Sequence, residues 1–207
     1  MGRLLLVRHG ETPWNAEGRI QGHSDVGLSE KGKRQAGLIA ERLAGVRIDA
    51  AYSSDLIRCQ DTAKAILAKH DIPLQATPDL RERFYGVFEG LTVADRQSRY
   101  PEMFAASVVN DLDFAPADGE TPRETIRRMT PVIDGIRRRH ADQTALIVGH
   151  GGSLRAAVIA LMELPDESTW RFVMANCSLS VFDTYHDNTV MLLYNDTSHL
   201  NHLGAGF

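Results

Sequence analysis

Short apolar runs alternate with stretches of helical periodicity along this chain of 207 residues. Residues 4–7 read Leu-Leu-Leu-Val and residues 144–149 read Thr-Ala-Leu-Ile-Val-Gly, and unbroken runs of this length are typical of strands buried on both faces. Elsewhere apolar side chains recur every three to four residues, as they do on one face of a helix. Predicted strands cover residues 4–7, 50–53, 74–76, 144–149, 179–184 and 189–194, and predicted helices cover 29–44, 55–69, 92–99, 101–109, a segment that starts at 121, and 153–164.

Residues that favour helix ends stand at the borders of several of these segments. Ser29 is a favourable N-cap for the helix predicted at 29–44, and Gly45 is a favourable stop signal after it. Thr121-Pro122-Arg123-Glu124 combines a capping box with proline at the first helical position, so a helix is expected to begin there. Pro131 then falls inside that helix and is expected to kink it or to remove one hydrogen bond.

The order of the predicted elements indicates an α/β fold. Strands that alternate with helices favour a three-layer α/β/α architecture, in which helices cover both faces of a mostly parallel central sheet. The last two predicted strands flank Asp187-Asn188 and should form a hairpin that gives the sheet an antiparallel edge strand. No Pro-, Gly- or Ser-rich linker divides the chain, so residues 1–207 are expected to form a single domain, with a less regular insertion at 90–120.

Composition and charge narrow the class of protein. The chain is 43% hydrophobic and 24% charged, which is ordinary for a globular protein. Its formal net charge of -4 argues against binding to nucleic acid or a membrane, since such proteins usually carry a basic excess. The first apolar run ends at Arg8, too early for a signal sequence or a membrane span. Cys59 and Cys177 alone do not make a disulfide framework, so we expect a cytoplasmic, reducing environment.

Histidine and arginine side chains follow the predicted strands at the points where ligands bind in such sheets. Arg8 and His9 come at the end of the first strand, and His150 comes directly after the strand at 144–149. Arg58 lies in the first turn of the helix that follows the strand at 50–53. Ligands of open α/β sheets bind outside the carboxyl ends of the strands, so these side chains are expected to converge.

Such a cluster suits phosphoryl chemistry. A guanidinium matches the oxygens of a phosphate bidentately, and a histidine among arginines is pushed toward its neutral, nucleophilic form. Other interpretations exist for each residue alone: a hydrogen-bonded structural histidine, a surface arginine, or a plain His-Gly-Gly turn. A metal site is disfavoured because no His-x-x-x-His or carboxylate-His spacing accompanies these histidines and the adjacent arginines would repel a cation.

These residues lie in motifs that resemble the histidine phosphatase superfamily, in its phosphoglycerate mutase-like branch. The first motif runs from Leu6 to Asn15 and reads Leu-Val-Arg-His-Gly-Glu-Thr-Pro-Trp-Asn. The resemblance extends over nearly the whole chain, and its motifs occur in order. Further blocks are residues 18–22, 28–32, 52–58, 80–90, 148–152, 176–178 and 195–200.

The resemblance implies catalytic roles. His9 would be the nucleophile that becomes phosphohistidine, and Glu82 would protonate the leaving oxygen and later take a proton from water. Arg8, Arg58 and His150 would surround the phosphoryl group. The backbone N–H of Gly151 and the side chain of Asn15 would also contact it, while the substrate would be faced more distantly by Gln21, Gly22, Arg83 and Tyr85.

The resemblance also bears on ligands. It implies no metal and no organic cofactor, because the histidines and arginines supply the positive charge that Mg²⁺ supplies elsewhere. The substrate would be a small phosphorylated metabolite, and family members often form homodimers. The insertion at 90–120 would serve as a lid that influences the choice of substrate.

The superfamily includes phosphatases and phosphoglycerate mutases, and departures from the mutase pattern favour a phosphatase. The third block here reads Glu82-Arg83-Phe84-Tyr85, where mutases carry histidine in place of Phe84. Mutases also carry a lysine and an arginine pair after this block, whereas residues 90–120 hold only Arg96 and Arg99 as cations. We therefore predict a metal-independent phosphatase, with a cofactor-dependent phosphoglycerate mutase as the alternative. A catalytically idle binding protein is disfavoured because the catalytic set is complete.

Overall fold

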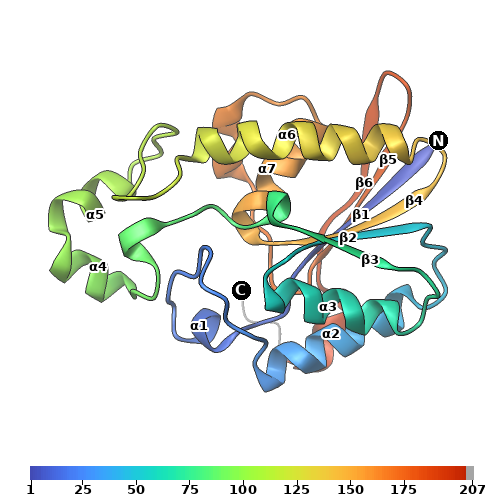
Figure 1. Cartoon of the computed structure of the whole chain (residues 1–207), viewed down its shortest axis with the longest axis horizontal. Coiled ribbons are helices and arrows are strands. Elements are labelled where there is room, and N and C mark those ends of the chain that lie inside the picture. The colour runs from blue at the N-terminus through green and yellow to red at the C-terminus, as the bar shows by residue number, and fades with distance from the viewer. Residues whose placement is uncertain (204–207) are drawn as a thin grey trace.

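The computed structural model describes residues 1–203, and it describes side chains as far as residue 201. Six strands form one sheet in the order β3-β2-β4-β1-β5-β6 (Figure 1). The strands are β1 (Gly2–Arg8), β2 (Ala50–Ser54), β3 (Leu74–Thr77), β4 (Thr144–Gly149), β5 (Leu179–Thr184) and β6 (Thr189–Asp196).

The sheet is mostly parallel, as the sequence predicts. Strand β1 pairs in parallel with β4, which pairs in parallel with β2, which pairs in parallel with β3. Strand β5 runs antiparallel to β1, and β6 returns antiparallel to β5 to form the edge. The turn of this hairpin is closed by a hydrogen bond from the Tyr185 N–H to the Asn188 carbonyl at 2.8 Å, which places the predicted Asp187-Asn188 turn correctly.

Helices cover both faces of the sheet, which completes the predicted three layers. Helices α2 and α3 lie on one face, and α6 and α7 lie on the other (Figure 1). Helices α4 and α5 lie at the opposite end of the molecule from the N-terminus (Figure 1). The α-helices are α1 (Pro13–Ala16), α2 (Glu30–Leu43), α3 (Ile57–Leu67), α4 (Val93–Arg99), α5 (Pro101–Ser107), α6 (Pro122–Arg139) and α7 (Gly151–Leu161), and the 3₁₀ helices are η1 (Pro78–Leu80), η2 (Gly86–Phe88), η3 (Asp166–Arg171) and η4 (Ser198–Leu203).

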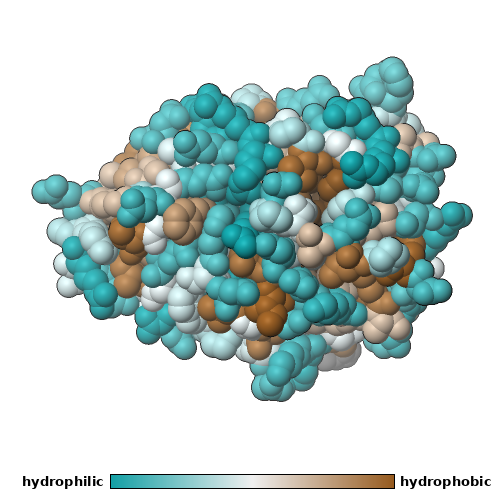
Figure 2. Space-filling model, in the orientation of Figure 1, coloured by the Kyte–Doolittle hydropathy of each residue, from teal (hydrophilic) through white to brown (hydrophobic). Residues whose placement is uncertain are grey.

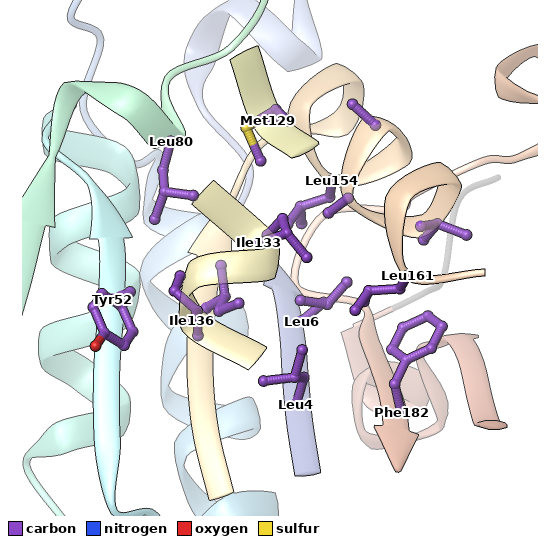
Figure 3. Close-up of a cluster of buried hydrophobic side chains, with 14 of the residues drawn as sticks. Leu4, Leu6, Tyr52, Leu80, Met129, Ile133, Ile136, Leu154, Leu161 and Phe182 are labelled. Atoms are coloured by element: carbon purple, nitrogen blue, oxygen red, sulfur yellow. The ribbon is translucent and has the colours of Figure 1, made fainter. Parts of the chain in front are cut away.

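The hydrophobic core has two parts, one on each face of the sheet. Successive side chains of a strand point to opposite faces, so Leu4 and Leu6 pack under α6 and α7, while Leu5 and Val7 pack under α2 and α3. Figure 3 shows the first part, where Met129, Ile133 and Ile136 of α6 belong to the same cluster as Leu4 and Leu6 of β1. Burial on both faces explains why β1 is an unbroken apolar run.

Several elements differ in detail from the sequence prediction, most of them by one to three residues at an end. Helix α7 begins at Gly151 instead of Ser153, because the Ser153 hydroxyl accepts the His150 N–H at 3.2 Å and caps an earlier first turn. Helix α1 was not predicted, since its four residues are too few to show a period. Helix α6 continues through Pro131, which lacks the N–H that would bond to the Arg127 carbonyl.

The surface in Figure 2 is dominated by hydrophilic residues, and its apolar patches are separated from one another. Among the residues that the structure describes, no helix combines the length and the apolar character needed to cross a membrane.

Candidate active site

Two neighbouring strands bring two histidines together. Arg8 at the end of β1 pairs in register with Gly149 at the end of β4, so the next residues, His9 and His150, lie side by side. Their ring centroids are 5.1 Å apart, with an interplanar angle of 64°. Arg58 approaches from the first turn of α3, and its side chain is fully buried. The convergence expected from the sequence therefore occurs.

The ring of His9 is oriented by its own neighbour. Its Nδ1 lies 2.7 Å from the carbonyl oxygen of Gly10. A carbonyl oxygen can only accept, so Nδ1 carries the proton and Nε2 keeps a free lone pair. The backbone is also fixed, because the His9 N–H donates to the Gly149 carbonyl at 3.0 Å and the His9 carbonyl accepts from the Asn176 side chain at 3.1 Å.

Both histidines are held neutral. Burial lowers the pKa of His9 well below 6.5, and the positive charges of Arg58 and Arg8 lower it further. Burial and the charge of Arg58 likewise lower the pKa of His150 well below 6.5. A neutral imidazole with an unprotonated Nε2 is a nucleophile, so the structure supplies the chemistry that the pattern of histidine and arginine indicates.

Arg58 orients His150. Its Nε–H donates to His150 Nδ1 at 3.2 Å, so the proton of that ring is on Nε2. The partner of Nε2 in the described part of the chain is the weak acceptor Cys59 Sγ, at 3.4 Å. The remaining guanidinium nitrogens of Arg58 donate to the carbonyls of Gly22 and Ser24, each at 2.7 Å. Gly22 thus acts through its backbone, by holding Arg58 in place.

Glu89 fixes the loop that carries these two carbonyls. Its carboxylate accepts the backbone N–H groups of His23 at 2.8 Å, Ser24 at 2.9 Å and Tyr85 at 3.2 Å, and the Ser24 hydroxyl at 2.7 Å. Gly22 has a φ of +53°, and a Cβ there would collide with the Glu89 carboxylate. Glu89 therefore joins the loop around residue 22 to the loop around residue 85.

Arg8, Asn15 and Gln21 direct polar groups toward the histidines. One terminal nitrogen of Arg8 donates to the Met174 carbonyl, whereas its buried Nε has no partner among the described residues. The Asn15 side-chain oxygen accepts the Thr12 N–H at 3.1 Å in a capping box at the start of α1, which leaves the amide N–H groups of Asn15 for a ligand. The side-chain oxygen of Gln21 is buried and likewise has no partner in the described structure.

Glu82 sits at the N-terminus of α7. Its Oε1 accepts the N–H groups of Arg83 at 2.8 Å and Ser153 at 3.0 Å, and its Oε2 accepts the N–H of Gly152 at 2.9 Å. A Cβ on Gly152 would collide with the Glu82 carboxylate, so the approach requires glycine there. Each carboxylate oxygen has about two acceptor sites, so Oε2 retains one that is free.

Most of the residues predicted for the site line one cavity of about 500 Å³. This catalytic cavity is lined by Arg8, His9, Asn15, Gln21, Gly22, Arg58, Glu82, Tyr85 and His150, together with Arg19 and Ile20. Gly151 lines an adjoining cleft. Arg83 turns away from the cavity, since its guanidinium donates to the carbonyls of Glu120 at 2.6 Å and Phe114 at 2.9 Å.

Besides Arg19 and Ile20, three residues near the site were not predicted to act in it: His23, Glu89 and Arg155. His23 bonds through Nε2 to the Glu82 carbonyl at 2.9 Å and so supports that residue, as Glu89 supports the loops. Arg155 lines the adjoining cleft together with Gly151 and Gly152. The sequence held a signal for Arg155, because it lies four residues after Gly151, the first residue of α7, and residues four apart share a face of a helix.

The donor set does not suit a metal ion. No group of three or more His, Cys, Asp or Glu side chains in the described part of the chain is arranged to hold one. His9 and His150 are flanked instead by Arg8 and Arg58, whose charges would oppose a bound cation.

Comparisons with known proteins agree with this geometry. The family model of the histidine phosphatase superfamily (branch 1) matches residues 4–197. A metal-independent phosphoserine phosphatase of Arabidopsis thaliana is 36% identical, over 97% of this chain and 84% of that protein. A probable phosphoglycerate mutase GpmB of Yersinia pestis (strain Pestoides F) is 38% identical, over 97% of this chain and 96% of that protein.

A solved structure shows the same fold. Bacillus stearothermophilus YhfR superimposes with a TM-score of 0.90 at 31% identity, covering 97% of this chain and all of the other. The family match spans the strands β1 and β4 that position the two histidines. The chain belongs to the histidine phosphatase superfamily, branch 1, and is a phosphomonoester hydrolase of that superfamily.

Proposed function

We propose that the protein hydrolyses a small phosphomonoester, without a metal ion, through a phosphohistidine formed on Nε2 of His9. The observation that carries this proposal is the hydrogen bond from His9 Nδ1 to the Gly10 carbonyl. It fixes the tautomer in which Nε2 is the nucleophile, and the lowered pKa of His9 keeps that nitrogen unprotonated at neutral pH.

The phosphoryl group would lie among fixed hydrogen-bond donors. Arg8, Arg58 and His150 border the catalytic cavity, and Asn15 and the N–H of Gly151 add neutral donors. A phosphoryl oxygen is a stronger acceptor than the Cys59 thiol and would take over the Nε2–H of His150. Preorganised donors in a buried site stabilise the charge that develops on the equatorial oxygens during transfer.

Glu82 would act as general acid and then as general base through Oε2. In the first step His9 Nε2 bonds to phosphorus, the bond from phosphorus to the ester oxygen breaks, and Glu82 gives its proton to that oxygen. In the second step a water molecule attacks phosphorus, Glu82 takes a proton from it, and the bond to His9 breaks to release phosphate. Such proton transfers contribute about 10²- to 10⁴-fold in rate.

The names of the relatives favour a small phosphorylated metabolite. A relative that covers nearly the whole chain is called a metal-independent phosphoserine phosphatase. Residues 90–120, which carry α4 and α5, would serve as a lid within a single domain, and the loop at 114–120 is tied to Arg83 beside the site.

A phosphoglycerate mutase is the second candidate, because the GpmB relatives carry that name. A mutase must hold a second anionic group while the phosphoryl group moves. Arg83 is bonded to two carbonyls, and Arg96 lies over the rings of Phe88 and Phe104, each at 5.6 Å. These two cations are already engaged, and Arg155 alone does not match the two charges of a second phosphate, so hydrolysis is favoured over transfer to a phosphorylated acceptor.

A trapping experiment tests the proposed mechanism. The protein is mixed with ³²P-labelled substrate, quenched in alkali to preserve phosphohistidine, and compared with His9→Ala and with His186→Ala, which removes an exposed histidine. We expect label and phosphate release in the wild type and in His186→Ala, and neither in His9→Ala. Label or turnover retained by His9→Ala would refute the assignment. A parallel mutase assay decides against hydrolysis if transfer between 2- and 3-phosphoglycerate exceeds phosphate release.

A further inference from the structure

A second cleft adjoins the catalytic cavity on the side of α7. Arg8, Glu82 and Tyr85 line both spaces, so the second cleft continues from the phosphoryl site past the Tyr85 ring. It encloses about 540 Å³. Its other lining residues are Gly151, Gly152, Arg155, Phe172, Val173 and Met174. We call this space the Arg155 cleft.

Arg155 is the cation of this cleft that lacks a protein partner. Among the described residues it makes no hydrogen bond and no ion pair, although it is only half-buried on α7. The neighbouring arginines are engaged: Arg8 bonds to the Met174 carbonyl, and Arg83 bonds to two carbonyls of the loop at 114–120. Arg155 shares the Arg155 cleft with Arg8 and a smaller pocket with Arg83.

The inner end of the cleft holds a second unused donor. A smaller pocket shares Tyr85, Gly152 and Arg155 with the Arg155 cleft and is also lined by Trp170. The indole N–H of Trp170 is buried and has no partner in the described structure. This N–H has almost no accessible surface, so the half-buried guanidinium of Arg155 is the donor that a ligand in the cleft can reach.

We propose that the Arg155 cleft binds a carboxylate on the part of the substrate that leaves after phosphoryl transfer, with Arg155 as its ligand. The proposal rests on the proposed function, because the catalytic cavity must take the phosphoryl group. Glu82 and Tyr85 border both spaces, so the ester oxygen would lie at Glu82 and the carboxylate beyond Tyr85.

The charge of the cleft favours a carboxylate over a second phosphate. One unpaired guanidinium matches the single charge of a carboxylate and its two oxygens, in the fork geometry that arginine favours. A second phosphate would bring about two negative charges, and the other cations beside the cleft already have partners. Phe172 and Met174 on the opposite wall suit a short carbon chain.

A matched pair of substrates tests this proposal. Phosphoserine and phosphoethanolamine differ only in the carboxylate, so the ratio of their kcat/KM values measures what the carboxylate contributes. We expect the wild type to favour phosphoserine and Arg155→Gln to reduce that ratio about 10- to 100-fold, as for the loss of one charge-assisted pair. The change should fall mainly on KM for phosphoserine.

The matched control is Arg138→Gln. Arg138 is exposed near the end of α6, which lies beside Gly2 at the amino end of β1, away from the active site. This substitution removes the same charge as Arg155→Gln and should leave the ratio of kcat/KM values unchanged. A ratio that is equal in the wild type and Arg155→Gln, or that falls equally in both arginine variants, would overturn the proposal.

The failure of the proposed function would look different. In that case the wild type would release no more phosphate from p-nitrophenyl phosphate than His9→Ala does. Turnover of p-nitrophenyl phosphate by the wild type, without preference for phosphoserine over phosphoethanolamine, would leave the phosphatase in place and overturn the carboxylate site alone.

Discussion

Replacing Glu89 with glutamine should destabilise the protein and also slow catalysis, although Glu89 does not bind the phosphoryl group in the proposed mechanism. Its Oε1 accepts the N–H groups of His23 and Tyr85, and its Oε2 accepts the N–H and hydroxyl of Ser24. Glutamine has one acceptor oxygen where glutamate has two. An amide NH₂ must therefore face either the two backbone N–H groups or the pair of donors on Ser24.

The arrangement with the NH₂ group facing Ser24 costs less stability, because the Ser24 hydroxyl can rotate and accept from the NH₂ group. The backbone N–H of Ser24 is then left without an acceptor, which costs about 1–3 kcal/mol. The surviving hydrogen bonds also become neutral, and neutral bonds are about 1 kcal/mol weaker than charged ones. With two backbone bonds weakened in this way, from His23 and Tyr85, we expect Glu89→Gln to lower the free energy of unfolding by about 3–5 kcal/mol.

Catalysis should suffer because the same loop positions Arg58. The carbonyls of Gly22 and Ser24 hold its guanidinium, and a displacement of about 1 Å in a catalytic group can reduce the rate about 10²-fold. Urea denaturation and kcat measured on p-nitrophenyl phosphate check the two effects. The control is Glu41→Gln, which breaks an exposed ion pair with Lys69 and should change stability by less than about 1 kcal/mol. A Glu89→Gln variant as stable and as active as this control would refute the reasoning.

Three further results are expected. Glu82→Gln should slow the hydrolysis of esters with poor leaving groups, such as phosphoserine, far more than that of p-nitrophenyl phosphate, because only a poor leaving group needs the proton. Equal slowing of both substrates would argue against Glu82 as the acid. The folded-state pKa values of His9 and His150 lie below 6.5, so the unfolded chain binds more protons than the folded chain below that pH. The free energy of unfolding should therefore fall as the pH drops from 6.5, by up to about 1.4 kcal/mol per pH unit for each histidine. Urea titrations at pH 7 and pH 5.5 should show a smaller fall in His9→Gln, and an unchanged fall contradicts the linkage. Activity should persist in EDTA, and activity lost to EDTA but restored by Mg²⁺ contradicts the metal-independent mechanism.

The sequence predicted the centre of the site better than its surroundings. His9 and His150 follow unbroken apolar runs, and such runs identify buried strands whose carboxyl ends face the ligand. The order of strands in the sheet is not visible in the pattern, because it depends on packing between distant segments. The structure supplies it by pairing β1 with β4, which makes the two histidines neighbours.

Arg83 shows what the sequence leaves open about an outer residue. Its place in a motif beside Glu82 predicts distant contact with the substrate, and the structure adds that its guanidinium bonds to the carbonyls of Phe114 and Glu120 while it lines a small pocket with Arg155. Those partners lie about 30 residues away in an irregular segment, and the direction of a long side chain depends on which carbonyls fold next to it. Arg155 is the converse case, since it lies outside the predicted set but lines the cleft beside the phosphoryl site.

One helix start sets the order of groups along the proposed substrate path. His150 precedes α7, the N–H groups of Gly152 and Ser153 hold Glu82, and Arg155 follows within the next turn. Successive turns of a helix are about 5.4 Å apart. His150 as phosphoryl ligand, Glu82 as the acid and Arg155 as the second anion site would therefore be spaced along α7 at distances that suit a short ester. Because Glu82 is tied to the same turn, the proton donor would lie between the transferred group and the group that leaves. This arrangement explains why a carboxylate at Arg155 would orient the ester oxygen toward Glu82, and why its loss should raise KM more than it lowers kcat.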